Sequence, residues 1–159
     1  MRTRLVVVAA AIILGCGTGA GPDPAAVRAT IDRKNRQIAR WYAEGQIDSV
    51  VAHFAADAWQ MPPNAPPLVG REAMRAFWSQ ATQWGTWRFE LNVQDVVVAD
   101  SIAVERGKYT LRFEAGSQSP IPASQDRGNY LVLWRLESDG EWRVVWDAPV
   151  SELPPGPGA

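Results

Sequence analysis

Apolar residues recur at helical spacing in three segments of the first half of the chain. The three stripes are Val27, Ile31, Ile38 and Tyr42; Ile47, Val50, Val51 and Phe54; and Met74, Phe77, Trp78 and Ala81. Spacings of three and four residues place side chains on one face of a helix. Asp23-Pro24 is typical of a helix start, while Gly45 and Gly85 are placed to end helices. The pattern therefore predicts three amphipathic helices.

From Trp87 onward the pattern changes to alternation with a period of two, which is typical of strands. Strands are expected at 87–98, 103–113, 129–136 and 142–146, with a hairpin at Asp139-Gly140. A short strand at 58–61 ends at Pro62-Pro63, which can neither continue a helix nor pair freely in a sheet. We expect an α+β fold. It would be a cone-like barrel, with three N-terminal helices packed on a curved, mostly antiparallel sheet around a cavity.

Length and composition predict one globular domain, which follows a distinct N-terminal segment. The chain has 159 residues, is 47% hydrophobic and contains 8 Trp, enough for a real core. Its formal net charge of -1 argues against a basic surface for nucleic acid. The first residues differ: Arg2 and Arg4 precede the apolar run 5–14, which has the length of a signal-peptide core.

The apolar run ends at Gly15-Cys16, and Cys16 is the only cysteine in the chain. This arrangement resembles a bacterial lipobox. The resemblance implies cleavage before Cys16, attachment of fatty acyl chains such as palmitate, and a membrane-anchored lipoprotein in the cell envelope, facing the periplasm or the exterior. An ordinary signal peptide that happens to contain Cys16 is the alternative. The predicted divisions are a signal peptide at 1–15, a tether at 16–23, the domain at 24–151 and a disordered tail at 152–159.

Several motifs of the domain resemble the SnoaL-like and ketosteroid-isomerase-like domains of the nuclear transport factor 2-like superfamily. They are Ala43-Glu44-Gly45-Gln46-Ile47-Asp48, Phe54-Ala55-Ala56-Asp57-Ala58, Met61-Pro62-Pro63-Asn64, Val69-Gly70-Arg71-Glu72-Ala73-Met74, Phe77-Trp78, Gly128-Asn129-Tyr130 and Asp139-Gly140-Glu141-Trp142-Arg143-Val144. The resemblance implies the cone-like barrel and homodimers formed through the open sheet face. The superfamily includes enzymes, ligand carriers and association modules, so membership in it does not fix the function. Met61 or Pro62 falls where the isomerases carry their base, and neither accepts a proton.

Three carboxylates are candidates for acid–base chemistry. Glu105 shares a strand face with Tyr109 and other apolar residues, so that burial would raise its pKa. Pairing of Glu105 with an arginine is the alternative. Asp147 follows Trp146 on the last strand and would need a β-bulge to face inward, because strict alternation turns it outward. Asp126 is the third candidate and is expected to be exposed.

Aromatic and neighbouring side chains are the candidates for a ligand pocket. They are Tyr42, Trp59, Met61, Trp78, Tyr109, Tyr130 and Trp146. The alternative is that most of them are ordinary core. With His53 as the one histidine, we expect no metal site and no cofactor.

The leading hypothesis from the sequence is an envelope-anchored domain that binds a small, apolar or aromatic molecule. A second is an isomerase, dehydratase or hydrolase that uses Glu105 or Asp147 as general base. A third is a non-catalytic dimerisation or docking module. No nucleic-acid partner is expected.

Overall fold

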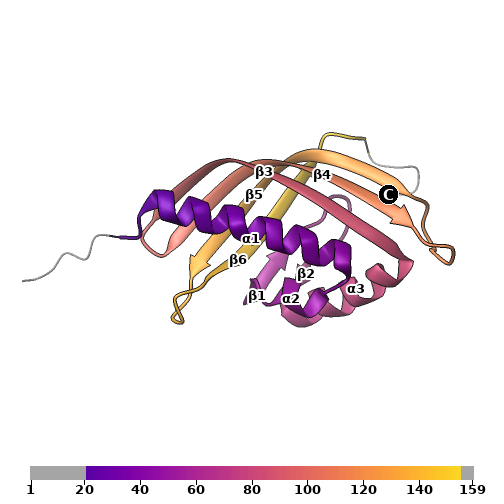
Figure 1. Ribbon diagram of the computed structural model, residues 1–159, viewed down its shortest axis with the longest axis horizontal. Helices are drawn as coiled ribbons and strands as arrows, with labels where there is room; N and C mark the ends of the chain where they lie inside the picture. Colours follow the sequence, from indigo (N-terminus) through magenta and orange to yellow (C-terminus); the bar gives the residue numbers. More distant parts are fainter. Residues whose placement is uncertain (1–20, 155–159) are drawn as a thin grey trace, which may run out of the picture.

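The computed structural model describes residues 21–154 (Figure 1). The elements are α1 (Pro24–Glu44), α2 (Ile47–Val51), β1 (Phe54–Gln60), β2 (Leu68–Val69), α3 (Gly70–Trp84), β3 (Gly85–Ala99), β4 (Ile102–Ala115), β5 (Ser124–Leu136) and β6 (Trp142–Ser151). The predicted signal peptide, Cys16 and most of the tether lie outside the described residues, as does the tail from 155 onward. None of the helices in the described range is long and apolar enough to cross a membrane.

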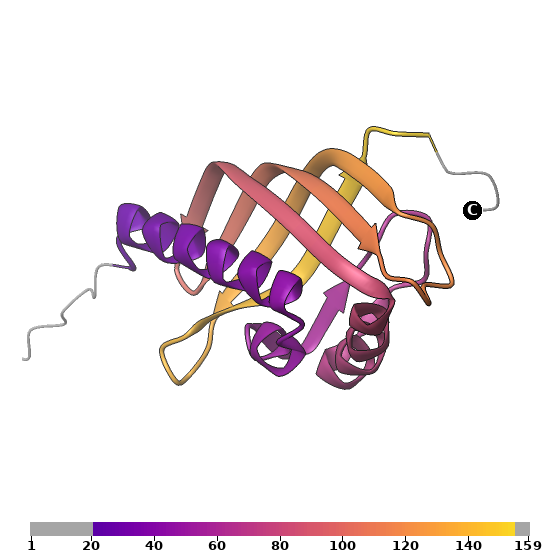
Figure 2. The same ribbon diagram turned by 45° about the vertical axis from the view of Figure 1, so that its right-hand side comes forward.

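The six strands form one sheet in the order β2-β1-β6-β5-β4-β3. Every neighbouring pair is antiparallel except β1 and β6, which run parallel. Figure 2 shows the long strands bending over α1, with α2 and α3 close to one end of that helix. The predicted α+β fold with a curved, mostly antiparallel sheet is confirmed.

The first helix forms as its sequence predicts. The Asp23 side chain accepts a hydrogen bond from the Ala25 backbone, Pro24 stands in the first turn, and Gly45 ends the helix with φ of 69°. The buried side of α1 also carries two polar residues, Lys34 and Asn35. Buried polar groups need partners, and both residues find them across the domain, as described below.

The short strand β2 was not predicted, and the largest differences in element boundaries are three. The second helix ends at Val51, and Phe54 instead begins β1, where it is buried. Strand β5 begins at Ser124, five residues earlier than expected, through a polar stretch whose backbone pairs with β4. Strand β6 continues to Ser151 through Pro149, because β1 ends opposite Asp147 and leaves β6 an edge strand there. A proline is tolerated at an edge, where its missing N–H is not needed.

The core lies between the concave face of the sheet and the helices. Its largest fully buried side chains include Trp134 and Phe113 from the sheet, Ile31 from α1 and Met74 from α3. The helices do not fill the whole concave face, and the uncovered part becomes the site described next.

Candidate functional site

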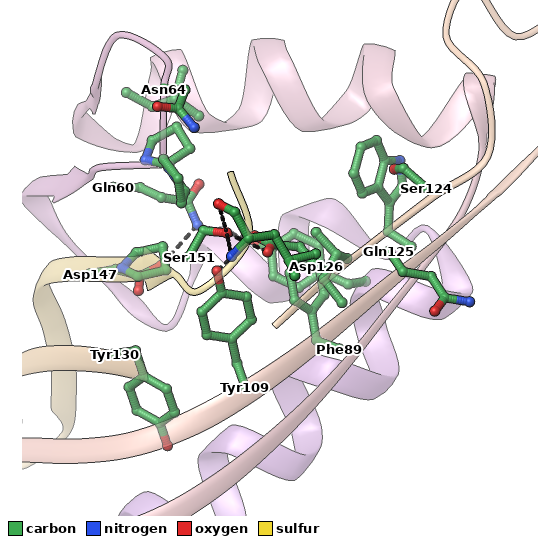
Figure 3. Close-up of a pocket in the computed structure, with 18 of the residues that line it drawn as sticks. Gln60, Asn64, Phe89, Tyr109, Ser124, Gln125, Asp126, Tyr130, Asp147 and Ser151 are labelled. Carbon is green, nitrogen blue, oxygen red and sulfur yellow. Dashed lines mark hydrogen bonds between the residues drawn. The ribbon is translucent and has the colours of Figure 1, made fainter. Parts of the chain in front are cut away.

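A cavity of about 510 Å³ opens on the concave side of the sheet (Figure 3). All six strands contribute to its wall, together with α1, α3, the loop after β1 and the segment after β6. The lining residues are Tyr42, Gln60, Pro62, Pro63, Asn64, Leu68, Phe77, Trp78, Trp87, Phe89, Tyr109, Leu111, Ser124, Gln125, Asp126, Tyr130, Asp147, Pro149, Ser151, Leu153 and Pro154. Most of this surface is apolar, and several of its polar side chains, Gln60, Asp126 and Asp147 among them, are held by hydrogen bonds.

Aromatic rings that pack edge to face form one side of the wall. The ring of Trp78 lies 4.6 Å from Tyr42, 5.4 Å from Trp87 and 6.1 Å from Phe89, centroid to centroid, at interplanar angles of 61° to 89°. Such contacts join the positive edge of one ring to the negative face of another. The rings therefore hold each other in position around the open space.

Gln60 is the centre of a buried hydrogen-bond network beside these rings. Its Oε1 accepts from the indole Nε1 of Trp78 at 2.7 Å. Its Nε2 donates to Asp147 Oδ2 at 3.0 Å and to Tyr42 Oη at 3.3 Å. One side chain thus ties α1, α3 and β6 to the end of β1. Burial raises the pKa of Tyr42, so its hydroxyl stays protonated.

A β-bulge turns Asp147 into the cavity. In the β5–β6 ladder Leu133 pairs with Trp146 and Trp134 pairs with Val144, which leaves Val145 as an extra residue on β6. An extra residue reverses the alternation of side chains beyond it. Trp146 consequently points outward and is 53% exposed, while Asp147 reaches Gln60. Burial raises the pKa of the Asp147 carboxyl.

A second polar group, near the start of β5, surrounds Asp126. Tyr109 Oη donates to Asp126 Oδ2 at 2.7 Å, and Ser151 Oγ donates to Oδ1 at 2.6 Å. The backbone N–H of Arg127 also donates to Oδ1. Burial and the neighbouring carboxylate raise the pKa of Tyr109, which keeps the donor in its protonated form. Asp126 is partly buried, not a free surface residue.

Glu105 lies behind the cavity wall and not on it. Its side chain is fully buried and accepts hydrogen bonds from Asn35 Nδ2 at 2.7 Å, Tyr130 Oη at 2.6 Å and Trp134 Nε1 at 2.8 Å. Burial raises the pKa of Glu105, and the three donors oppose that shift. Opposite Tyr130, a Cβ on Gly107 would lie 2.3 Å from the tyrosine hydroxyl, so the glycine gives the ring room to reach Glu105.

The comparisons with known proteins identify the family. Residues 35–145 match the model of a family described as "SnoaL-like domain". The chain belongs to the SnoaL-like domain family. The resemblance seen in the sequence is thereby confirmed, while the lipoprotein signal remains a prediction. A search of curated proteins found no match.

Solved structures share the fold of this SnoaL-like domain at low sequence identity. A ketosteroid isomerase-like protein from Erwinia carotovora atroseptica is 16% identical with a TM-score of 0.67, over 79% of this chain and 96% of the other. A provisionally assigned scytalone dehydratase from Novosphingobium aromaticivorans is 13% identical with a TM-score of 0.69, over 81% and 86%. A nuclear transport factor 2-like superfamily protein from Salmonella enterica is 12% identical with a TM-score of 0.70, over 84% and 96%.

The structure brings together part of the predicted set. Tyr42, Trp78, Tyr109, Asp126, Tyr130 and Asp147 line the cavity of the SnoaL-like domain. The other predicted residues lie elsewhere.

Trp59 and Trp146 pair across β1 and β6 on the outer face, 43% and 53% exposed. Met61, which follows β1, and Glu105 are absent from the lining. Glu105 also has no arginine partner: Arg135 pairs with Asp57 and Glu137 instead.

Sequence reasoning missed three lining residues that matter. Trp87 and Phe89 share one face of the predicted β3 alternation, so that pattern could have identified them. Gln60 was harder to identify, because the sequence shows only a single amide residue shortly before Pro62-Pro63. Within residues 21–154 no group of three His, Cys, Asp or Glu side chains is close enough to hold a metal ion.

Replacing Asp147 should change how stability depends on pH. Because burial raises the pKa of Asp147 above its ordinary 3.8, the folded protein binds this proton more tightly than the unfolded chain. Protonated Asp147 therefore contributes to the free energy of unfolding at low pH, and this contribution is lost as the pH rises through the pKa that Asp147 has in the folded protein. We expect Asp147→Asn to be more stable than wild type at pH 7, by roughly 1 kcal/mol. The advantage should vanish near pH 3.

Urea unfolding followed by tryptophan fluorescence at pH 3, 5 and 7 measures this difference. Asp95→Asn, at an exposed position on β3, is the matched control and should show little effect. A variant less stable than wild type at pH 7 would mean that the hydrogen bond from Gln60 outweighs the cost of burial.

Proposed function

We propose that this SnoaL-like domain binds a small, largely apolar molecule in its cavity. The observation that carries the proposal is the cavity itself: about 510 Å³, mostly apolar, walled by aromatic rings, and with hydrogen-bonded polar groups at Gln60, Asp126 and Asp147. Ligand sites are typically concave, mostly apolar and supplied with a small number of positioned polar groups. The Gln60 network and the edge-to-face rings support a preformed site, because they hold the walls in place without a ligand.

Filling the cavity should weaken binding. Leu111 lines the cavity from β4, opposite Phe89 on β3. We expect Leu111→Trp to weaken binding of the apolar fluorescent probe N-phenyl-1-naphthylamine at least tenfold, because the larger ring occupies the same space. Fluorescence titration of the probe measures the affinity.

The same substitution on the outer face is the control. Leu131 is 53% exposed on β5, so Leu131→Trp should leave probe binding unchanged. Equal binding by wild type and Leu111→Trp would count against the cavity as the site.

A second candidate function is acid–base catalysis by Asp147. Its support is that Asp147 borders the cavity, forms no salt bridge within the described residues and is held by the neutral donor Gln60. A carboxylate whose pKa is raised above its ordinary value is better suited to take and return a proton. The names of the isomerase-like and dehydratase neighbours point to the same class of chemistry.

Hydrogen exchange tests the catalytic candidate. The ketone 2-tetralone is flat and apolar, and its α-hydrogens are acidic. We expect wild-type protein to accelerate exchange of these hydrogens in D₂O and Asp147→Asn to lose about 10²-fold or more of that rate. Proton NMR follows the exchange. If the variant keeps the wild-type rate, Asp147 is not the base; if wild type matches buffer, this candidate loses its support.

We also propose that a lipid on Cys16 tethers the domain in the cell envelope. The proposal rests on the apolar run that ends at Gly15-Cys16. In a bacterial host, intact-mass spectrometry should show a mature chain that starts at Cys16 and carries a diacylglyceryl group. Cys16→Ser should lose this mass and leave the membrane fraction. A wild-type chain with a free Cys16 thiol would refute the tether.

The outer sheet face is the surface we propose for a homodimer. One apolar residue from each strand lies in register across it: Val69, Trp59, Trp146, Leu133, Val104 and Val97. Five of the six are well exposed, and an apolar row of this kind favours a protein contact. Because the row is on the convex side, a second copy there would leave the cavity free. Light scattering reports the mass of the assembly.

A further inference from the structure

We infer that the ligand of the cavity is an organic cation, an amine or quaternary ammonium group carried on an apolar body. This inference rests on the proposed small-molecule binding and adds the chemical class. It follows from three properties of the wall: the sign of its charges, the nature of its rings, and an acceptor atom that the protein itself leaves available.

All charges on the cavity wall are negative. Asp126 and Asp147 line it, and within residues 21–154 no lysine, arginine or histidine does. Neither aspartate forms a salt bridge to any described residue. Their partners are neutral: Gln60 for Asp147, and Tyr109, Ser151 and a backbone N–H for Asp126. A cation brought by a ligand would be the first positive charge in the site.

Aromatic rings surround the same space. Seven of the lining residues are aromatic: Tyr42, Phe77, Trp78, Trp87, Phe89, Tyr109 and Tyr130. The face of an aromatic ring carries negative charge and attracts a cation within about 6 Å of its centre. Alkylated ammonium groups are held by such aromatic walls because their methyl groups also pack against the rings.

The Asp147 carboxylate keeps one oxygen available to a ligand. Its Oδ2 accepts from Gln60, whereas Oδ1 has no hydrogen-bond partner among the described residues. Asp147 is half-buried, and this oxygen is not fully enclosed, since Arg143 Nε is the one fully enclosed side-chain nitrogen or oxygen in the described range that lacks a partner. An N–H donor or a cationic methyl group could therefore reach Oδ1 from the cavity.

The spacing of the two carboxylates argues against a shared inorganic ion. Asp126 is fixed to Ser151, and Asp147 stands four residues before Ser151 on β6. Four residues of a strand span about 13 Å of backbone, and within residues 21–154 no three His, Cys, Asp or Glu side chains lie close enough to hold a metal ion. An anionic ligand would be repelled by both carboxylates, and a neutral one would bring no charge to balance them.

Two probes of the same shape test the inference on the purified full chain. Benzyltrimethylammonium carries a charged nitrogen, and neopentylbenzene has a neutral carbon in its place. Quenching of tryptophan fluorescence measures both affinities, since Trp78 and Trp87 are in the wall. We expect the cation to bind wild-type protein roughly tenfold more tightly than its neutral counterpart, a ratio that cation–π attraction and one nearby charge can supply.

Charge-removing variants locate the effect. Asp126→Asn and Asp147→Asn should each weaken binding of the cation severalfold more than they weaken binding of neopentylbenzene, so that the ratio of the two affinities falls. Asp95→Asn removes the same charge from an exposed position outside the cavity and should change neither. The comparison of probes on wild type stands even if a variant fails to fold.

The outcomes separate this inference from the proposed function. Equal affinity for the two probes, or tighter binding of neopentylbenzene, overturns the cationic ligand while the cavity remains a binding site. If N-phenyl-1-naphthylamine binds and benzyltrimethylammonium does not, the cationic ligand is likewise overturned, and the cavity remains a binding site. If none of the three probes binds, both the cationic ligand and small-molecule binding are refuted.

Discussion

One buried carboxylate joins the helical layer to the sheet. Glu105 on β4 accepts a hydrogen bond from Asn35 on α1 and two more from Tyr130 and Trp134 on β5. Burying a carboxylate is costly unless its oxygens are satisfied, and here three donors converge on it. The position of α1 across the concave face and the direction of the Tyr130 ring are therefore set by the same interaction. Gly107 makes that interaction possible by leaving space beneath the ring.

The cavity remains hollow because its wall is held from behind and from the side. Glu105 anchors Tyr130 from behind the wall, and Gln60 links Trp78, Tyr42 and Asp147 along it. An amide suits that place because it accepts from an indole and donates to a carboxylate at the same time. Side chains engaged in this way are not free to collapse into the open space. The lining is therefore arranged before any ligand arrives.

The distribution of charge separates the inside of the cavity from the rest of the molecule. Basic side chains are engaged elsewhere: Lys34 with Glu141, Arg135 with Asp57 and Glu137, and Arg143 with Asp139. The acceptors of these pairs lie at the surface or near it. The two aspartates of the cavity have neutral partners instead, so no basic side chain of the described residues neutralises them. The cavity is therefore negatively charged for two reasons: two aspartates line it, and no basic side chain of the described residues does.

The sequence by itself determined the class of fold and the inward or outward direction of most side chains. Helical spacing, capping residues and strand alternation are local properties, so α1, α3 and the long strands could be located from them. Alternation also placed Glu105 and Tyr109 on the inward face of β4, as the structure has them.

Only the tertiary structure decided which residues make the site. A single extra residue at Val145 reversed the directions of Trp146 and Asp147, and a bulge depends on pairing with a distant strand. The partners of Glu105 come from α1 and β5, up to 70 residues away in the chain, so no local pattern could separate an arginine pair from three neutral donors. The contributions of Gln60 and Asp126 were likewise settled by long-range hydrogen bonds, which form only when the sheet closes around the helices.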